Sequence, residues 1–247
     1  MFGFFKKNNK LSAEIVSMLP ISTDIHSHIL PGIDDGAQDI EASMVLITGL
    51  QKLGIKKMVA TPHIIGDMFR NNAETISNAL NIVNTTCKQR GIDIEITAAA
   101  EYMLDDYFMD LLKHNVPLLT IHDNLVLTEQ SYNMPTRNIN EICFSIHTEG
   151  YKPILAHPER YGYYYGQYEA YDELKNLGFL FQVNLLSLTG YYGKGAKQAA
   201  KYLFEKGMVD YVGTDIHHPK HLEAFGVPEN LQAIARATAG KTYNTLG

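Results

Sequence analysis

Histidines and carboxylates follow nearly every strand-like segment of this 247-residue chain. His26 and His28 are two residues apart, so an extended strand would turn both imidazoles toward the same face. Asp215 and His217 repeat this spacing near the end of the chain. The full set of candidate metal donors is His26, His28, Asp35, His63, Glu101, Glu129, His157, Asp215 and His217. Imidazole nitrogens and carboxylate oxygens are common ligands of divalent transition metals, so the pattern indicates a metal centre.

The number of donors matters more than any single one. A lone histidine at a strand end is more often a hydrogen-bonded structural residue than a ligand. Several buried carboxylates together are costly unless a cation compensates them, which favours the metal interpretation for the whole set. Nine nitrogen and oxygen donors without a thiolate predict Mn, Fe or Zn, and they are too many for one ion. We therefore expect two or three ions.

The segment after the first histidine pair, Pro31–Gly36, is rich in turn residues and contains two adjacent aspartates. Such a loop can fold a carboxylate back over the site. The sequence leaves open whether Asp34 or Asp35 takes this role.

The elements that would position these residues alternate between strands and helices. Strand-like runs rich in Ile, Val and Leu occur at 23–28, 57–61, 92–99, 124–128, 153–156, 179–183 and 210–214. Helical patterns occur at 41–53, 72–90, 105–114, 138–148, 168–177, 196–206 and 229–237. Five helices are followed by a glycine suited to a left-handed cap, at Gly54, Gly91, Gly150, Gly178 and Gly207.

Strict alternation of this kind predicts an α/β fold with parallel strands and right-handed crossovers. Seven units favour a distorted (β/α)7 TIM-like barrel, in which functional groups gather at the C-terminal ends of the strands. Because the first and last strands are neighbours in a closed barrel, the His26/His28 pair and the Asp215/His217 pair should meet. We expect residues 1–20 to form an N-terminal extension and 21–247 a single domain.

Composition excludes some classes of protein. A formal net charge of −6 argues against nucleic-acid binding, which depends on clustered basic residues. Cys87 and Cys143 form no metal-binding or redox spacing, which fits a reducing compartment. No run resembles a signal peptide or a transmembrane span, so a cytoplasmic protein without stable membrane insertion is expected. Phe2, Phe4 and Phe5 could touch a membrane surface, but a frayed terminus is the favoured interpretation.

Five blocks of sequence carry a family resemblance: Asp24–Gly36 (DIHSHILPGIDDG), Thr61–His63 (TPH), Ala100–Tyr102 (AEY), His157–Tyr161 (HPERY) and Thr214–His217 (TDIH). Between residues 22 and 218 the chain resembles the bacterial PHP-domain (polymerase and histidinol phosphatase) protein-tyrosine phosphatases encoded with capsule and exopolysaccharide genes. The resemblance implies a distorted seven-stranded barrel of PHP type with three metals, usually manganese. It also implies hydrolysis of phosphotyrosine on a cognate bacterial tyrosine kinase.

The resemblance further implies a role for each residue. The first metal would be held by His26, His28, Glu101 and Asp215, the second by Glu101, Glu129 and His157, and the third by Asp35, His63 and His217. Arg160 would contact the phosphate. Members of the family often carry a second arginine soon after the last Asp-x-His motif, whereas this chain has His218-Pro219-Lys220-His221 there. Lys220 would be a weaker substitute, because lysine lacks the bidentate fork of arginine.

The expected nucleophile is a hydroxide bridging the metals, since a bound cation can lower the pKa of water to about 7. A covalent cysteine mechanism is excluded, because Asp93 and Glu149 stand where an arginine would be needed after Cys87 and Cys143. The chain also lacks the serine-hydrolase elbow, the Walker A loop and the HExxH zinc motif.

A tyrosine-rich run, Tyr161–Tyr168, follows Arg160 directly. Tyr163, Tyr164 and Tyr165 either surround an aromatic substrate or anchor their own loop, with no preference between the two. Lys194, in the glycine-rich segment after the sixth strand, could approach a phosphate, but a helix start explains that segment equally well.

Three other functions compete with a tyrosine phosphatase. A different PHP phosphoesterase, acting on histidinol phosphate or a nucleotide, would share the same metal site. An amidohydrolase is disfavoured, because the bridging lysine of that class is missing at Thr128–Gln130. A non-catalytic scaffold stabilised by metals is disfavoured by the presence of Arg160 beside every expected ligand.

Overall fold

The computed structural model describes residues 18–246 of the chain. The phenylalanines at positions 2, 4 and 5 lie outside the described residues. The division into an extension of residues 1–20 and a single domain of 21–247 stays a prediction.

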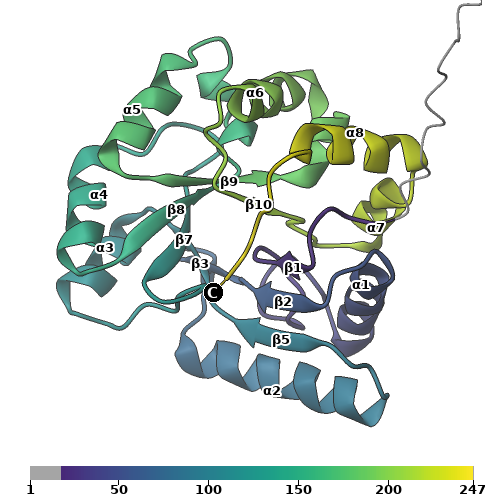
Figure 1. The fold of residues 1–247 in the computed structure, drawn as a ribbon. Helices are drawn as coiled ribbons and strands as arrows, with labels where there is room; N and C mark the ends of the chain where they lie inside the picture. The colour runs from purple at the N-terminus through teal and green to yellow at the C-terminus, as the bar shows by residue number, and fades with distance from the viewer. Residues whose placement is uncertain (1–17, 247) are drawn as a thin grey trace, which may run out of the picture.

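Strands and helices alternate along the described chain, as expected (Figure 1). The strands are β1 (Thr23–Asp24), β2 (Lys57–Ala60), β3 (His63–Ile65), β4 (Phe69–Arg70), β5 (Glu95–Ala98), β6 (Glu101–Met103), β7 (Leu125–Glu129), β8 (Lys152–Ala156), β9 (Leu180–Asn184) and β10 (Tyr211–Gly213). The α-helices are α1 (Ile40–Lys52), α2 (Ala73–Gln89), α3 (Asp106–Lys113), α4 (Ile139–Thr148), α5 (Glu169–Leu177), α6 (Gly193–Glu205), α7 (Pro219–Phe225) and α8 (Pro228–Thr238). Short 3₁₀ turns follow β8 and β9, at Pro158–Arg160, Gly162–Tyr164 and Leu185–Thr189.

The strands form two sheets with largely parallel pairing. One sheet has the order β1-β2-β5, and the other has the order β10-β9-β8-β7-β6-β3-β4, with β4 antiparallel to β3. In Figure 1 the helices ring the outside of the strands. The predicted α/β fold with parallel strands is therefore confirmed, but the strands do not make one continuous barrel.

The break between the sheets falls at Pro62, which separates β2 from β3. Proline has no backbone N–H and so interrupts a ladder of hydrogen bonds. The pairing resumes beyond it, because the N–H of Glu101 donates to the carbonyl of Pro62 at 3.1 Å and His63 then pairs with Glu101. The strand expected at 92–99 corresponds to β5, and a further strand that the sequence did not predict, β6, follows it and begins with the candidate donor Glu101.

The chain after β1 and the chain after β10 touch, although β1 and β10 are in different sheets. Ser27 and Ile216 form an isolated parallel bridge, and the N–H of Asp215 donates to the carbonyl of His26 at 2.9 Å. The Asp24 carboxylate also accepts from the backbone N–H of Thr214 at 3.0 Å. The first and last strand segments are thus neighbours, which brings the two pairs of candidate donors together.

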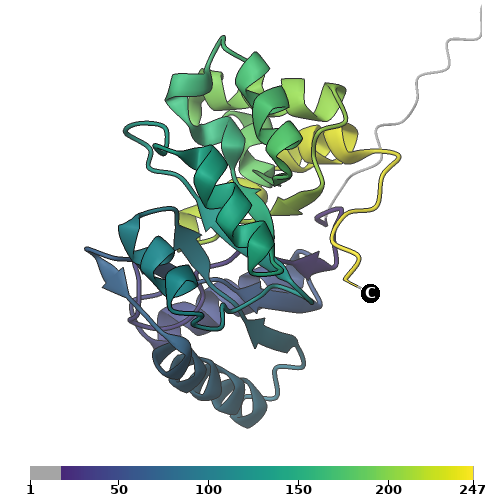
Figure 2. The same ribbon diagram turned by 90° about the vertical axis from the view of Figure 1, so that its left-hand side faces the viewer.

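Asn244 makes a second link between these strands at their opposite ends. Its side-chain amide donates to the carbonyls of Thr23 and Val212 at 2.8 Å each, and its oxygen accepts from the N–H of Val212 at 3.1 Å. Figure 2 shows the yellow C-terminal segment running past the purple start of the described chain. One side chain thereby satisfies three backbone groups of β1 and β10.

Two hydrophobic clusters support the sheets. The smaller consists of buried residues from several strands and their ends: Ile25, Val59, Ala99, Ile121, Leu127, Ile154 and Ala156. The larger is contributed by the helices together with the strand faces that they cover. Alternation of side chains along a strand places neighbouring residues in different clusters, as with Leu127 and Val126 of β7.

All seven predicted strands and seven predicted helices have counterparts, and the five expected capping glycines have positive φ. The sequence did not predict the β3–β4 hairpin, strand β6 or helix α7. All three are short, and α7 begins at Pro219, two residues after the candidate donor His217, where the sequence gave no helical pattern.

Cys87 of α2 and Cys143 of α4 are buried free thiols. Within residues 18–246, no helix has both the length and the apolar character needed to cross a bilayer.

Replacing Asn244 by glycine should lower the free energy of unfolding by about 1–3 kcal/mol, because three backbone groups of β1 and β10 lose their partner. Glycine keeps the left-handed backbone that Asn244 adopts, with φ of 58°, so strain does not contribute. Urea denaturation measures the change. Asn115→Gly is the matched control, since Asn115 is exposed and has φ of 54°. Equal stability of the two variants would show that the Asn244 link contributes little.

Candidate metal centre

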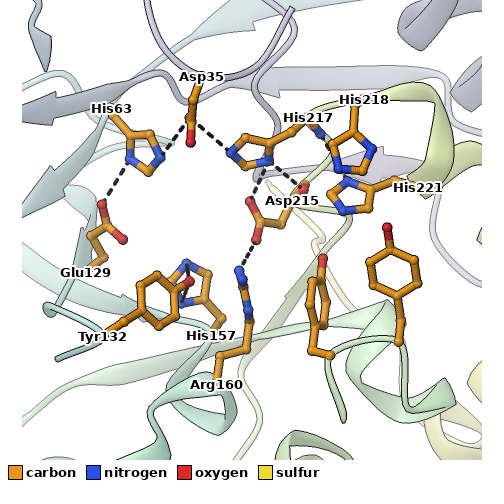
Figure 3. A pocket seen from close by; sticks show the side chains of 12 residues that line it. Asp35, His63, Glu129, Tyr132, His157, Arg160, Asp215, His217, His218 and His221 are labelled. Atoms are coloured by element: carbon orange, nitrogen blue, oxygen red, sulfur yellow. Dashed lines mark hydrogen bonds and ion pairs between the residues drawn. The ribbon is translucent and has the colours of Figure 1, made fainter. Parts of the chain in front are cut away.

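The nine predicted donors lie around one site. Figure 3 shows Asp35, His63, Glu129, His157, Asp215 and His217 among them. His26 and His28 follow β1, His63 begins β3, Glu101 begins β6, Glu129 ends β7, His157 follows β8, and Asp215 and His217 follow β10. Asp35 reaches the site from the loop between β1 and α1. Parallel strands bring their C-terminal ends to one edge, and His63 and Glu101 lie just beyond the ends of β2 and β5, which explains why residues almost two hundred positions apart converge.

Glu101 lies at the centre of the cluster and is fully buried. Its Oε2 atom is 3.2 Å from Nε2 of His26 and 3.2 Å from Nδ1 of His63. Its Oε1 atom is 3.1 Å from Nε2 of His157. One carboxylate therefore faces imidazoles from three different strand ends.

Asp215 uses its two oxygens in different directions. Oδ1 is 3.3 Å from Nε2 of His26 and 3.4 Å from Nδ1 of His217. Oδ2 accepts hydrogen bonds from Arg160 and from the side-chain amide of Asn184, at 2.7 Å each. One oxygen thus belongs to the donor cluster, and the other holds the predicted phosphate-contacting arginine.

The outer side of the cluster is formed by Asp35, His63, His217 and Glu129. Oδ1 of Asp35 is 3.4 Å from Nε2 of both His63 and His217. Nδ1 of His63 is also 2.9 Å from Oε1 of Glu129. Asp35 is 59% exposed in its side chain, so this part of the site opens to solvent.

Neighbouring side chains fix the orientation of the first histidine pair. Nδ1 of His28 bonds to the carboxylate of Asp34 at 2.8 Å, and Nδ1 of His26 bonds to Oε1 of Gln182 at 2.7 Å. Both rings therefore turn Nε2 toward the cluster, which is the usual function of such outer partners in metal sites. The structure resolves the choice left open by the sequence: Asp35 faces the cluster, and Asp34 orients His28.

The charges of the cluster depend on one another. Burial acts to raise the pKa of Glu101, but charged His26 and His63 lower it well below its usual range. Burial opposes protonation of His26, yet Glu101 and Asp215 raise its pKa to about 9. Without another source of positive charge, protons on the imidazoles must balance the carboxylates.

Several buried atoms of the site have no hydrogen-bond partner within the described chain. They are both carboxylate oxygens of Glu101, Oε1 of Glu129 and Nδ1 of His63, whose close contacts with one another and with neighbouring imidazoles lack hydrogen-bond geometry. Buried polar atoms are rarely left unsatisfied, and these are atoms that coordinate divalent cations. The residues present therefore fit a bound metal cluster.

Four groups of donor atoms are close enough to share an ion: His28–Asp35–His63–His217, His26–His28–Glu101, His26–His157–Asp215 and His63–Glu101–Glu129. These groups overlap with the three sets implied by the family resemblance but are not identical to them. His63 lies with Glu101 and Glu129, where His157 was expected, and His157 lies with His26 and Asp215. The assignment of donors to individual metals stays a prediction.

Two of the candidate donors occupy left-handed backbone. His157 has φ of 36° and Asp215 has φ of 50°, a region that costs about 1–2 kcal/mol for a residue with a Cβ atom. Such strain is often found at functional sites, where the surrounding structure enforces it.

Arg160 lies between two aromatic rings at the edge of the cluster. Its guanidinium carbon is 4.2 Å from the ring centroid of Tyr192 and 4.9 Å from that of Tyr132. Together with the ion pair to Asp215, these contacts hold a flexible side chain in one place.

A cavity of about 350 Å³ opens beside the cluster. Its lining combines candidate donors with residues that the sequence did not single out as a group: Asp35, His63, Glu129, Tyr132, His157, Arg160, Tyr191, Tyr192, Asp215, His217, His218 and His221. The tyrosines of this lining, Tyr132, Tyr191 and Tyr192, lie in the segments after β7 and β9.

Tyr163, Tyr164 and Tyr165 are not among the residues that line this cavity. Tyr163 donates to the carbonyl of Ser131 at 3.1 Å, and Tyr164 accepts from Gln130 at 3.1 Å. Of the two interpretations of the tyrosine-rich run, the structure supports the one in which it anchors its own loop.

Lys194 and Lys220 are exposed and do not line the cavity. Whether Lys220 replaces a second arginine was left open by the sequence, and its exposed position on the first turn of α7, outside the cavity, gives that possibility no support. His218 and His221 occupy this side of the cavity. Sequence reasoning also missed Gln182 and Asn184, although polar residues alternating along an apolar strand were an available signal.

The protein belongs to a class of α/β folds with parallel strands and a candidate multi-metal centre. Imidazoles, carboxylates and an arginine form this centre at the strand ends. The profile of the family described as "Capsular polysaccharide synthesis, CpsB/CapC" matches residues 22–245. The chain belongs to this family, as its sequence motifs predicted.

Several proteins similar to this chain are named as tyrosine-protein phosphatases. Tyrosine-protein phosphatase CpsB of Streptococcus pneumoniae is 31% identical over 202 residues, covering 79% of this chain and 82% of the relative. Tyrosine-protein phosphatase YwqE of Bacillus subtilis is 28% identical over 199 residues, covering 80% and 78%. A crystal structure reported for YwqE and the pneumococcal CpsB, described as metal-dependent tyrosine phosphatases, matches with a TM-score of 0.78 at 24% identity. That match covers 91% of this chain and 89% of the other.

Gly36→Ala should disturb the site, because a Cβ atom there would lie 2.2 Å from the His28 carbonyl oxygen and 2.5 Å from its Cβ. Overpacking of this kind costs about 1–3 kcal/mol and would displace His28. Thermal unfolding and the metal content of the purified variant measure both effects. Gly162→Ala is the control, since its nearest neighbour would be 3.9 Å away. A Gly36 variant with normal stability and metal content would contradict the proposed packing.

Proposed function

We propose that this protein is a metal-dependent phosphatase that hydrolyses phosphotyrosine on proteins. The observation that carries the proposal is the site itself, where buried carboxylate oxygens of Glu101 and Glu129 have no hydrogen-bond partner in the described chain and Arg160 lines the same cavity as Glu129. The names of the relatives support the same reaction. We further propose that the fold is a distorted (β/α)7 barrel of PHP type, supported by the Ser27–Ile216 bridge between the first and last strand segments.

The nine donors would hold two or three ions, with manganese as the expected metal. When bound, such ions supply a nucleophile from water at neutral pH and neutralise negative charge on the phosphoryl group. The buried, charge-balanced position of Glu101 suits a ligand shared between ions, because it faces donors from three strand ends. Gln182 and Asp34 keep His26 and His28 in the tautomers that present Nε2.

Arg160 would bind the phosphoryl oxygens. The guanidinium has five N–H donors in a fixed plane, and its ion pair with Asp215 uses Nη1. Other donors remain for an anionic substrate, and hydrogen bonds between charged groups are the strongest available for holding phosphate. The aromatic rings of Tyr132 and Tyr192 orient this fork before the substrate arrives.

The substrate is expected to be an aromatic phosphate ester. Tyr132 and Tyr191, which are 45% and 40% exposed, offer ring surface at the cavity for the phenyl ring of phosphotyrosine. A phenol with a pKa near 10 is also a better leaving group than an aliphatic alcohol, so little help with its protonation is required. We propose a bacterial tyrosine kinase of capsule or exopolysaccharide synthesis as the partner, acting in the cytoplasm.

The reaction can be tested on the purified full chain. With Mn²⁺, a phosphotyrosine peptide should be hydrolysed, and chelation should abolish turnover and lower the melting temperature, because bound ions stabilise the folded state. Adding Mn²⁺ back should restore both. Histidinol phosphate and a single-stranded oligonucleotide serve as competing substrates. Preference for either would assign a different phosphoesterase, and no turnover of any substrate by the metal-loaded protein would favour a scaffold.

Arg160→Lys should lower kcat/KM for the phosphotyrosine peptide by about 100-fold, because lysine cannot donate from a planar fork to a developing negative charge. Steady-state kinetics with a measured metal content would show the loss at unchanged metal occupancy. Arg236→Lys on α8 is the matched control, since Arg236 is exposed and outside the cavity. Activity of the Arg160 variant within twofold of the control would remove Arg160 from the substrate site.

A further inference from the structure

His221 is a polar residue of the cavity that the metal cluster does not use. It lies in the first turn of α7, is 6% exposed and lines the cavity beside His217 and His218 (Figure 3). Its ring packs against His218 with centroids 4.1 Å apart and meets Tyr191 edge to face at 5.2 Å. These contacts leave the ring little freedom.

The hydrogen bonding of His221 fixes its tautomer. The backbone N–H of His217 donates to Nδ1 of His221 at 3.1 Å. A backbone N–H can only donate, so Nδ1 must offer its lone pair, and the ring is then neutral with its proton on Nε2. None of the hydrogen bonds formed among the described residues engages Nε2 of His221. The ring therefore contributes an uncharged N–H donor without a protein partner in residues 18–246.

The packing of α7 holds this donor in place. Leu222, the next residue, lies so close to Gly49 of α1 that a Cβ atom on Gly49 would be 2.4 Å from it. Phe225 anchors the end of the helix and is fully buried. A donor held on a packed helix loses little entropy when it meets a ligand, which is the property expected of a binding residue.

We propose that His221 binds substrate, donating from Nε2–H to an oxygen of the phosphate monoester in the cavity, as an uncharged counterpart of Arg160. The inference rests on the proposed phosphatase function. A neutral N–H donor can still hydrogen-bond an anionic oxygen, although it lacks the charge of the second arginine that family members often carry. It also explains how this side of the cavity recognises an anion while Lys220 points into solvent.

Two substitutions separate the binding role from a structural one. His221→Asn keeps a side-chain acceptor near the N–H of His217 but removes the donor at the Nε2 position. His221→Gln keeps an N–H donor at the distance of Nε2 but loses the acceptor. Glu223→Gln is the matched control, since Glu223 is exposed on the same helix and does not line the cavity. Metal content and melting temperature are measured for every variant.

The probe is inorganic phosphate, titrated calorimetrically into the Mn²⁺-loaded full chain, with kcat/KM for the phosphotyrosine peptide as a second readout. His221→Asn should weaken phosphate binding and lower kcat/KM by about tenfold or more, the effect of losing a hydrogen bond to a charged group. His221→Gln should lose less than His221→Asn, and the control should match the parent protein.

Two results would overturn the inference. Parent-like phosphate binding by His221→Asn would show that Nε2–H does not contact the anion. A loss in both variants that follows a fall in metal content or melting temperature would assign His221 a structural role. The proposed function is judged separately. If the parent protein binds phosphate but does not hydrolyse the peptide, that function fails, whereas weaker phosphate binding by His221→Asn would still support the contact.

Discussion

The structure depends on compensation of buried negative charge at the ends of the strands. Glu101, Glu129 and Asp215 are almost fully buried, and Glu101 meets imidazoles from three strand ends. Burial of such groups is unfavourable unless positive charge lies beside them. Protonated histidines supply part of it, and the carboxylate oxygens without a hydrogen-bond partner in the described chain are available to coordinate divalent cations. The fold therefore holds buried negative charge that a bound metal cluster would neutralise.

Contacts elsewhere in the fold hold these side chains in position. Ser27–Ile216 and Asn244 join β1 to β10 at opposite ends, so that His26 and Asp215 face each other although they are far apart in sequence. Asp34 and Gln182 then set the direction of the His28 and His26 rings. Metal affinity in such sites depends on these outer contacts as well as on the ligands.

In the proposed function, the groups that would bind the phosphate ester are distinct from the donor cluster but are linked to it through Asp215. One oxygen of Asp215 faces the histidines, and the other binds Arg160. Arg160 and the neutral donor of His221 both line the cavity, with Tyr192 in contact with the arginine. In this proposal the site combines the charge of Arg160 with the uncharged donor of His221 and the aromatic ring of Tyr192.

The sequence by itself determined the order of strands and helices and the residue types at the strand ends. Both are local properties: Ile- and Val-rich runs, capping glycines and the spacing of His26 from His28 are visible without neighbours in space. Only the tertiary structure decided that Pro62 splits the sheet, that Asp34 orients His28 while Asp35 faces the cluster, and that Tyr132, Tyr192 and His221 form the cavity instead of Tyr163 and Lys220. These outcomes depend on contacts between segments far apart in the chain, which no local pattern records.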